Sequence, residues 1–234
     1  MAFTEPFEKY ALPSSIFFIC VFSYIFKFSQ REKISFVIPC YNSTNTIGRV
    51  VQEIKEVMNN SMNKYDYEII LVNDGSPDGT TYDAILELVK TEKYIKGVNL
   101  ARNFGQPSAV MAALNQATGD YVVCGDDDGQ TPFNELDKLF QKIEEGYDLV
   151  EAKYAVREKR SLFRKLGTVL NESMATWLIA KPHGLELTTY WVTRRFVVDQ
   201  MISYPNSFPY LGGLMLRATQ NACNVNVTHR ERLS

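Results

Sequence analysis

The 234-residue sequence has few cysteines, no strong excess of charge and no sign of low complexity, and each of these excludes a class of protein. Its four cysteines lie far apart without any C-x-x-C pair, so we expect buried free thiols rather than a zinc site or a disulfide framework. A formal net charge of −2 gives no reason to expect a nucleic-acid partner. Ordinary apolar and charged fractions indicate a folded globular protein.

A long membrane-spanning run is also missing. Residues 15–26 are almost wholly apolar, but they fall short of the roughly 20 residues that a spanning helix needs. A secretory signal fits poorly, because no basic region precedes them and no A-x-A-like site follows. We therefore treat residues 1–32 as an apolar extension with three open interpretations: a short anchor dipping into the membrane, a segment packed on the domain, or a start assigned too far upstream.

From Lys33 onward, short β-rich runs alternate with amphipathic helical patterns. Strands are predicted at residues 34–38, 68–72, 98–100 and 120–124, with helices at about 47–58, 81–89, 107–116 and 132–145. This alternation predicts an α/β fold with a mostly parallel, Rossmann-like sheet flanked by helices. Polar clusters follow three of the strands, at residues 39–42, 73–78 and 126–130. Because parallel strands end at one edge of a sheet, we expect one cleft to collect them.

The third cluster is the most informative, because it contains Asp126, Asp128 and Gln130. If the chain stays extended there, alternate side chains point the same way and offer three oxygen donors. Such donors suit Mg²⁺ or Mn²⁺ rather than zinc, and a diphosphate would complete the coordination. The alternative is an acidic turn that caps the next helix. Three consecutive aspartates repel one another, however, and this favours a bound cation.

The character of the chain changes after about residue 150, and we divide it into a nucleotide-binding half, residues 33–150, and an acceptor-binding half, residues 151–234. Residues 153–165 are strongly basic and lead into an amphipathic helical pattern that carries Trp177. This segment fits either a solvated helix face or a site for an anionic head group at a membrane surface. The abrupt stop at Ser234 suggests a fragment.

Four motifs in order, FVIPCYN at residues 36–42, VNDGSPDGT at 72–80, NLARNFGQ at 99–106 and DDDGQ at 126–130, resemble the family 2 glycosyltransferases of GT-A fold. Within that family the chain is most similar to the polyprenyl-phosphate glycosyltransferases, the dolichol-phosphate mannose synthase and bactoprenol glucosyltransferase group. The resemblance covers residues 34–234. It departs from the family pattern at Ser43 and Asn73, where relatives often have glutamate and aspartate.

The resemblance implies a role for particular positions. The metal and diphosphate would be held by Asp126, Asp128 and Gln130, and the acceptor lipid phosphate by Arg157 and Arg164. The nucleotide-sugar side would be formed by Pro39, Tyr41, Asn42, Asp74, Ser76 and Asp127. The last residues, 229–234, resemble the stretch that precedes the family's membrane helices.

We therefore expect a metal-dependent, inverting transfer of a sugar from a UDP- or GDP-sugar to a polyprenyl phosphate, undecaprenyl or dolichyl, at the cytoplasmic face of the membrane. An ionised phosphate oxygen needs no general base, and the second half offers arginines rather than a paired acid. A homo-oligomer is possible. Two alternatives stay open: transfer to a sugar hydroxyl in polysaccharide synthesis, and a non-catalytic nucleotide-sugar-binding module. A sugar nucleotidyltransferase is disfavoured, because no Gly-rich basic loop follows the first strand.

Overall fold

Four parallel strands form one side of the sheet, and three of them are buried, mostly apolar runs. In this computed structural model, which describes residues 31–154 and 181–232, these strands are β1 (Lys33–Cys40), β2 (Asp66–Asn73), β3 (Ile95–Asn99) and β4 (Tyr121–Cys124). β1 pairs in parallel with both β2 and β4, and β2 pairs in parallel with β3. The near-continuous burial of β1 and β2 is what a parallel sheet covered on both faces requires.

Three further strands extend the sheet beyond β4, namely β5 (Leu149–Tyr154), β6 (Trp191–Arg194) and β7 (Ala222–Val227). The strand order is β3-β2-β1-β4-β6-β5-β7, and β6 runs antiparallel to both of its neighbours. β5 and β7 pair in parallel. The predicted mostly parallel α/β sheet is therefore confirmed. The proposed division after residue 150 falls inside β5, so strands from both halves share one sheet.

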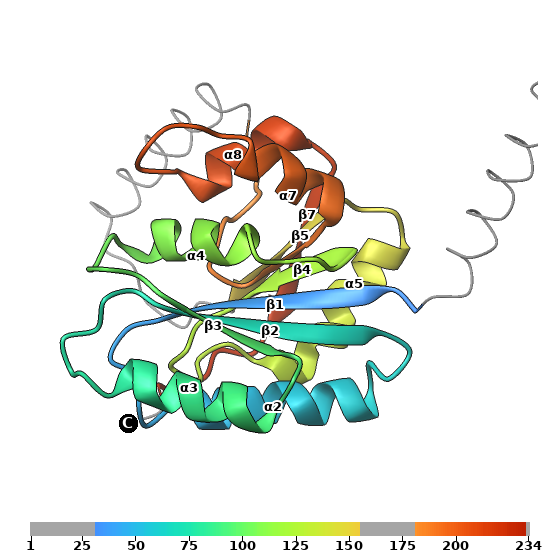
Figure 1. Cartoon of the computed structure of the whole chain (residues 1–234). Coiled ribbons are helices and arrows are strands. Elements are labelled where there is room, and N and C mark those ends of the chain that lie inside the picture. The colour runs from blue at the N-terminus through green and yellow to red at the C-terminus, as the bar shows by residue number, and fades with distance from the viewer. Residues whose placement is uncertain (1–30, 155–180, 233–234) are drawn as a thin grey trace, which may run out of the picture. The chain divides into compact units, whose positions relative to one another are not determined.

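Helices cover both faces of this sheet, as Figure 1 shows. On one face lie α2 (Ile47–Asn60), α3 (Thr81–Thr91), the short helix η2 (Phe133–Glu135) and α5 (Leu136–Glu144). On the other lie α4 (Gln106–Leu114), α7 (Arg195–Ile202) and α8 (Leu211–Ala218). Each set buries its apolar side chains against the sheet, so two hydrophobic clusters sandwich the strands.

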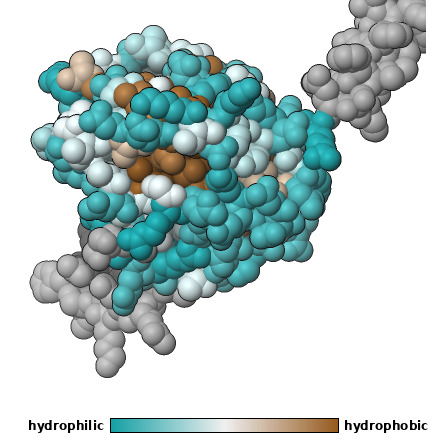
Figure 2. Space-filling view, turned by 60° about the horizontal axis from the view of Figure 1, so that its bottom comes forward, coloured by the Kyte–Doolittle hydropathy of each residue, from teal (hydrophilic) through white to brown (hydrophobic). Residues whose placement is uncertain are grey.

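The face shown in Figure 2 is mostly hydrophilic, and its most prominent group of hydrophobic residues lies in one hollow. Within the described ranges, no helix combines the length and apolar character needed to cross a bilayer. The thiols of Cys40 and Cys124 are free and buried, as predicted, and that of Cys223 is free and half-buried. Cys20 and the rest of the N-terminal extension lie outside the described residues.

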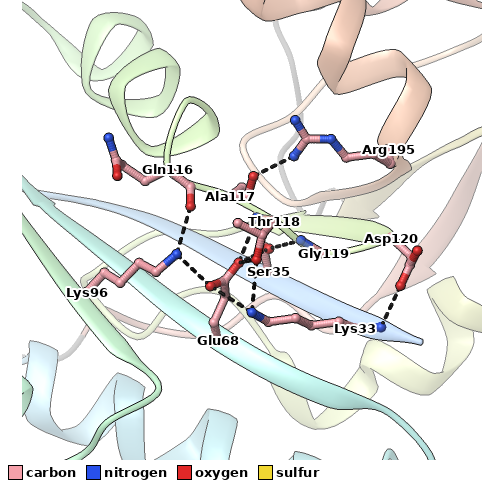
Figure 3. Close-up of polar contacts among 10 residues, drawn as sticks. All are labelled: Lys33, Ser35, Glu68, Lys96, Gln116, Ala117, Thr118, Gly119, Asp120 and Arg195. Carbon is pink, nitrogen blue, oxygen red and sulfur yellow. Dashed lines mark hydrogen bonds and ion pairs between the residues drawn. The ribbon is translucent and has the colours of Figure 1, made fainter. Parts of the chain in front are cut away.

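A buried carboxylate, Glu68, holds the amino ends of the central strands together (Figure 3). Its Oε1 accepts hydrogen bonds from the Ser35 hydroxyl of β1 at 2.7 Å and from the Thr118 backbone N–H at 2.7 Å and hydroxyl at 2.8 Å. Its Oε2 lies 3.0 Å from the Lys33 Nζ and 2.8 Å from the Lys96 Nζ. One side chain thus connects β1, β2, β3 and the segment before β4.

These contacts set the charge state of Glu68. Burial alone would raise its pKa, but the bonds from Lys96, Ser35, Thr118 and Lys33 outweigh it and lower the pKa from 4.5 to about 2. The carboxylate is therefore ionised in the folded protein at any pH near neutrality. Because the lowered pKa belongs to the folded state, its contribution to stability is present above about pH 4.5 and is lost as the pH falls towards 2.

We predict that Glu68→Ala lowers the free energy of unfolding by about 2–4 kcal/mol, because it leaves a buried hydroxyl, a backbone N–H and two ammonium groups without their shared acceptor. Urea denaturation at pH 7 measures this change. The exposed Glu87→Ala variant, which loses only a surface ion pair to Lys90, is the control and should shift stability by less than about 0.5 kcal/mol. Equal effects of the two substitutions would contradict a central role for Glu68.

A second buried acid, Glu151 on β5, is fully buried and has only one oxygen engaged. Its Oε2 accepts hydrogen bonds from the Thr188 backbone N–H at 2.9 Å and from the Thr188 hydroxyl at 3.2 Å. Its Oε1 has no hydrogen-bond partner among the described residues. Burial raises the pKa of Glu151 to about 8, against the opposing effect of the bonds from Thr188, so the acid is mainly protonated at neutral pH.

This raised pKa predicts a pH-dependent loss of stability. The folded state binds a proton that the unfolded chain releases above about pH 4.5, so stability falls as the pH rises from 4.5 through 8, by up to about 1.4 kcal/mol per pH unit. The Glu151→Gln variant, which resembles the neutral acid, should lack this component. Urea denaturation of both proteins between pH 5 and 9 measures the difference, and parallel pH profiles would show that Glu151 does not titrate as described.

Candidate functional site

A cavity of about 320 Å³ lies where β1, β2 and β4 end. The expectation that parallel strands bring their polar termini to one edge is met here, because residues after all three strands line this cavity. The lining consists of Pro39, Cys40, Tyr41, Asp74, Asn103, Gly105, Gln106, Asp126, Asp127, Asp128 and Arg232. Carboxylates dominate the charge of this set.

The three aspartates after β4 reach the cavity through a bend rather than an extended chain. Residues 127–129 are bent, and Gly129 has a φ of 77°, so the expectation of an extended alternation is wrong. The bend is closed by the Gln130 backbone N–H, which donates to the Asp128 Oδ1 at 2.9 Å. Asp126 and Asp128 nevertheless both line the cavity, as the sequence predicted, and Asp127 joins them.

Each of these carboxylates has different partners. The Asp126 Oδ1 accepts from the Gln106 Nε2 at 2.9 Å, and its Oδ2 accepts from the Thr189 hydroxyl at 2.5 Å. The Asp127 Oδ2 faces the turn after β1 and accepts from the Tyr41 backbone N–H at 2.9 Å and from the Ser43 hydroxyl. Asp127 therefore organises the β1 turn, while Asp126 connects α4 with the segment before β6.

The electrostatics of this cluster favour a cation. Burial, together with the neighbouring carboxylates, raises the pKa values of both Asp126 and Asp127 above their ordinary range. The Arg232 Nε lies 3.5 Å from the Asp128 Oδ2, and this guanidinium is the only basic group in the cavity lining among the residues that the structure describes. Crowded acids that are poorly compensated by one arginine form a site at which a divalent cation would be stabilised.

Gln130, the third predicted metal ligand, has its side-chain amide nitrogen engaged outside the cavity. Its Nε2 donates to the Arg230 carbonyl at 3.3 Å, and the residue does not appear in the cavity lining. Across the described ranges, no three His, Cys, Asp or Glu side chains are arranged to hold a metal ion by themselves. The donor set that the structure offers is thus Asp126 and Asp128, and the part of Gln130 stays a prediction.

The β2 end contributes Asp74, which is buried and lines the cavity. Its Oδ1 accepts from the Phe104 backbone N–H at 2.8 Å, and its own N–H donates to the Cys40 carbonyl at 2.9 Å. Gly75 makes this approach possible, because a Cβ there would lie 2.2 Å from the Arg102 carbonyl carbon and its φ is 59°. The second and third motifs are thereby locked together.

The remaining predicted nucleotide residues divide into two groups. Pro39 and Tyr41 line the cavity, and the Tyr41 side chain is exposed. Asn42 and Ser76 do not line it: the Asn42 backbone N–H donates to the Ser76 hydroxyl at 3.1 Å, and that hydroxyl donates to the Asn73 Oδ1 at 2.5 Å. These two residues therefore support the turns beside the cavity in this structure.

Some residues of the cavity were not assigned to it from the sequence. Asn103, Gly105 and Gln106 belong to the third motif. Its position between two strands indicated a functional loop, but no role in the site was predicted for its residues. Arg232 sits 5 residues beyond the last residue of β7, Val227, and only the basic character of residues 230–232 pointed to it. Arg157 and Arg164, the predicted acceptor-phosphate ligands, lie outside the described residues.

A second cavity, of about 270 Å³, adjoins the first. Gln106 lines both, and the Asp126–Thr189 hydrogen bond joins their walls. Its lining is largely apolar and comes from α4, α8 and the segment that leads into β6. A larger cavity of about 570 Å³ is lined in part by residues 102–104, and none of its described lining residues is a carboxylic acid. The acidic cavity is therefore the candidate metal and diphosphate site.

Comparison with known proteins agrees with this geometry. The family described as "Glycosyl transferase family 2" matches residues 35–202. The chain is 32% identical over 208 residues to the undecaprenyl-phosphate 4-deoxy-4-formamido-L-arabinose transferase of Photorhabdus laumondii, covering 88% of this chain and 62% of that protein. It is 33% identical over 204 residues to the same transferase of Yersinia enterocolitica, covering 86% and 61%. The chain spans about three fifths of the length of these relatives.

Solved structures share the fold at lower identity. Glucosyl-3-phosphoglycerate synthase of Mycobacterium tuberculosis aligns with a TM-score of 0.59 at 21% identity, covering 86% of this chain and 72% of that one. Mannosyl-3-phosphoglycerate synthase of Rubrobacter xylanophilus aligns with a TM-score of 0.59 at 18% identity, covering 87% and 66%. These likenesses confirm the predicted GT-A fold.

The family match includes all four motifs from which the resemblance was drawn, and the structure brings residues from each of them to one cavity. The chain belongs to glycosyl transferase family 2.

Proposed function

We propose that this chain carries the catalytic domain of a metal-dependent, inverting glycosyltransferase that moves a sugar from a nucleoside diphosphate sugar to a polyprenyl phosphate. The observation that supports it most is the single cavity shared by Asp74, Asp126, Asp127 and Asp128. The relatives at 32–33% identity are named as undecaprenyl-phosphate sugar transferases. The glucosyl-3-phosphoglycerate synthase of Mycobacterium tuberculosis, which is 22% identical to this chain, has been solved in complex with Mn²⁺, UDP-glucose and phosphoglyceric acid.

The donor set fits a hard divalent cation, Mg²⁺ or Mn²⁺. Asp126 and Asp128 offer carboxylate oxygens, and two carboxylates leave coordination positions for diphosphate oxygens. When bound, the cation would offset the charge that develops on the departing diphosphate. The residues nearer β1 and β2, namely Pro39, Tyr41 and Asp74, would bind the nucleoside.

Arg232, the basic residue among the described cavity lining, would also stabilise the negative charge that develops on the departing diphosphate. Its guanidinium lies beside Asp128 and is within reach of an anion in the cavity. As the bond from the anomeric carbon to the diphosphate oxygen breaks, the electron pair stays on that oxygen, where a fixed cation stabilises it. An acceptor phosphate oxygen supplies the electron pair of the new bond from the opposite face, which inverts the anomeric centre.

The acceptor class that we propose is supported by the described residues of the second half that line the two cavities. The acidic and the apolar cavity are partly lined by described residues that follow Tyr154. None of these residues is an Asp or a Glu. A hydroxyl acceptor would need such a base, whereas a phosphate is already ionised at neutral pH. We assign the lipid phosphate to Arg157 and Arg164 on sequence grounds. A polyprenyl phosphate resides in the bilayer, so we propose that the reaction takes place at the membrane surface, and we keep the cytoplasmic face as the expectation drawn from the sequence.

Asp128→Asn is expected to lower the rate of sugar transfer about 100-fold or more while the fold persists, because it removes a carboxylate from the metal site and relieves repulsion. The assay incubates the protein with undecaprenyl phosphate and radiolabelled UDP- or GDP-sugars in Mn²⁺ or Mg²⁺, followed by lipid extraction. Asp83→Asn, on the exposed face of α3, is the matched control. Near-normal turnover of Asp128→Asn in the presence of metal would refute the metal assignment.

Arg232→Ala is expected to lower kcat/KM about 10- to 100-fold, because the cavity loses its one described cation. Arg232→Lys should recover part of this loss, since it restores the charge without the planar fork. The exposed Arg217→Ala on α8 serves as the control. If Arg232→Ala and Arg217→Ala have the same kcat/KM, Arg232 does not act on the diphosphate.

A further inference from the structure

The position of Arg232 beside Asp128 is not set by the contacts of the Arg232 side chain itself. That side chain is 70% exposed, and the structure gives it one ion pair, in which its Nε lies 3.5 Å from the Asp128 Oδ2. An exposed ion pair of this kind is weak, and the rotamer entropy of a free arginine side chain opposes it. A guanidinium that stays at the acidic cavity therefore requires a fixed backbone leading up to Arg232.

Arg230, two residues earlier, fixes that backbone through contacts with α2 and η2. Its Nη1 donates to both carboxylate oxygens of Glu53 on α2, at 2.8 Å and 2.9 Å, and its Nη2 donates to the Asn134 Oδ1 on η2. The Asn134 backbone N–H donates to the same carboxylate at 3.2 Å. The Glu53 and Arg230 side chains are both half-buried. A charge-assisted pair with several bonds has a defined geometry, which a single surface ion pair lacks.

The two residues before Arg230 are also held. The Thr228 backbone N–H donates to the Glu135 Oε1 at 3.2 Å. The His229 ring packs edge-to-face on Tyr154, at the end of β5, with 5.7 Å between the ring centroids. Three consecutive residues after β7 thus contact three different elements of the domain, and the chain reaches Arg232 from a fixed direction.

The same segment is connected to the turn that carries Asp128. The Gln130 Nε2 donates to the Arg230 carbonyl at 3.3 Å, and the Gln130 backbone N–H donates to the Asp128 Oδ1 at 2.9 Å. With the ion pair between Asp128 and Arg232, these contacts close a ring. Neither Glu53 nor Arg230 is among the residues that line the acidic cavity, so their effect on its chemistry passes through the residues that they hold.

We propose that the Glu53–Arg230 ion pair is a positioning element for sugar transfer, which fixes Arg232 where its guanidinium meets a diphosphate in the acidic cavity. The inference rests on the proposed function, since it assumes a nucleoside diphosphate in that cavity. Glu53 and Arg230 are positioning residues and not catalytic ones. They restrict the positions that Arg232 samples, so that its charge is already in place when the charge of the leaving group develops.

Arg230→Ala is expected to lower kcat/KM for sugar transfer about 5- to 10-fold, because Arg232 is then free to turn away from the diphosphate. The undecaprenyl phosphate assay measures kcat/KM. Calorimetric titration of the full chain with UDP and with GDP in Mn²⁺ measures Kd, which should rise severalfold. Arg230→Lys should recover part of both losses, since it keeps the charge without the planar fork. Glu53→Gln keeps the shape of the side chain but not its charge, and should reproduce part of them.

The decisive comparison is made in an Arg232→Ala background. There, adding Arg230→Ala should change kcat/KM by less than about 2-fold, because Arg230 has no arginine left to position. Arg217→Ala on α8 and Glu56→Gln on the exposed face of α2 are the matched controls and should behave as the parent chain. If Arg230→Ala does not fold, Glu53→Gln with and without Arg232→Ala gives the same comparison.

Two results overturn the inference and leave the proposed function in place. In the first, the losses caused by Arg230→Ala and Arg232→Ala multiply in the double variant, which shows that Arg230 acts independently of Arg232. In the second, Glu53→Gln and Arg230→Lys retain the kcat/KM and Kd of the parent chain while Arg232→Ala loses both. Failure of UDP and GDP to bind the parent chain removes the proposed function and this inference together.

Discussion

Repulsion among carboxylates at the carboxyl end of β4 is the constraint on which this site depends. Asp126, Asp127 and Asp128 stand in a row, and their burial makes the accumulated charge costly. Hydrogen bonds offset part of this electrostatic cost. Asp126 accepts them from α4 and from the segment before β6, and Asp127 accepts one from the turn after β1. What remains, around Asp128, faces one arginine and an open cavity. In the function that we propose, a divalent cation completes this site.

At the other end of the strands, where they begin, a buried carboxylate is stabilised by its surroundings. Glu68 is buried as well, but two lysines, a hydroxyl and a backbone N–H satisfy it, so its charge stabilises the folded state. The fold thus places Glu68, a carboxylate with a full set of partners, where the strands begin (Figure 3), and carboxylates with fewer partners where the strands end. Stability and chemistry are separated along the strand direction, as is typical of open α/β sheets.

Much of this arrangement was predictable. The alternation of apolar runs and amphipathic helices predicted β1 to β4 and their helices, because a strand buried on both faces leaves a local pattern. β5 was not foreseen, since residues 149–154 combine apolar and charged side chains. The antiparallel direction of β6 was equally hidden, because pairing direction depends on partners far away in the chain.

The sequence by itself determined the fold class, the family and the acidic character of the site. Each of these can be recognised from short segments without knowledge of the contacts that the segments make in the folded chain. Only the tertiary structure decided how those residues are used. In the folded chain, Asp127 accepts a hydrogen bond from the turn after β1, and the side-chain amide of Gln130 donates to a backbone carbonyl. Arg232, at the end of the described chain, lies beside Asp128. The tertiary structure also created the apolar cavity at α8. Those outcomes depend on contacts between residues that lie 86 to 104 positions apart, which no local pattern records.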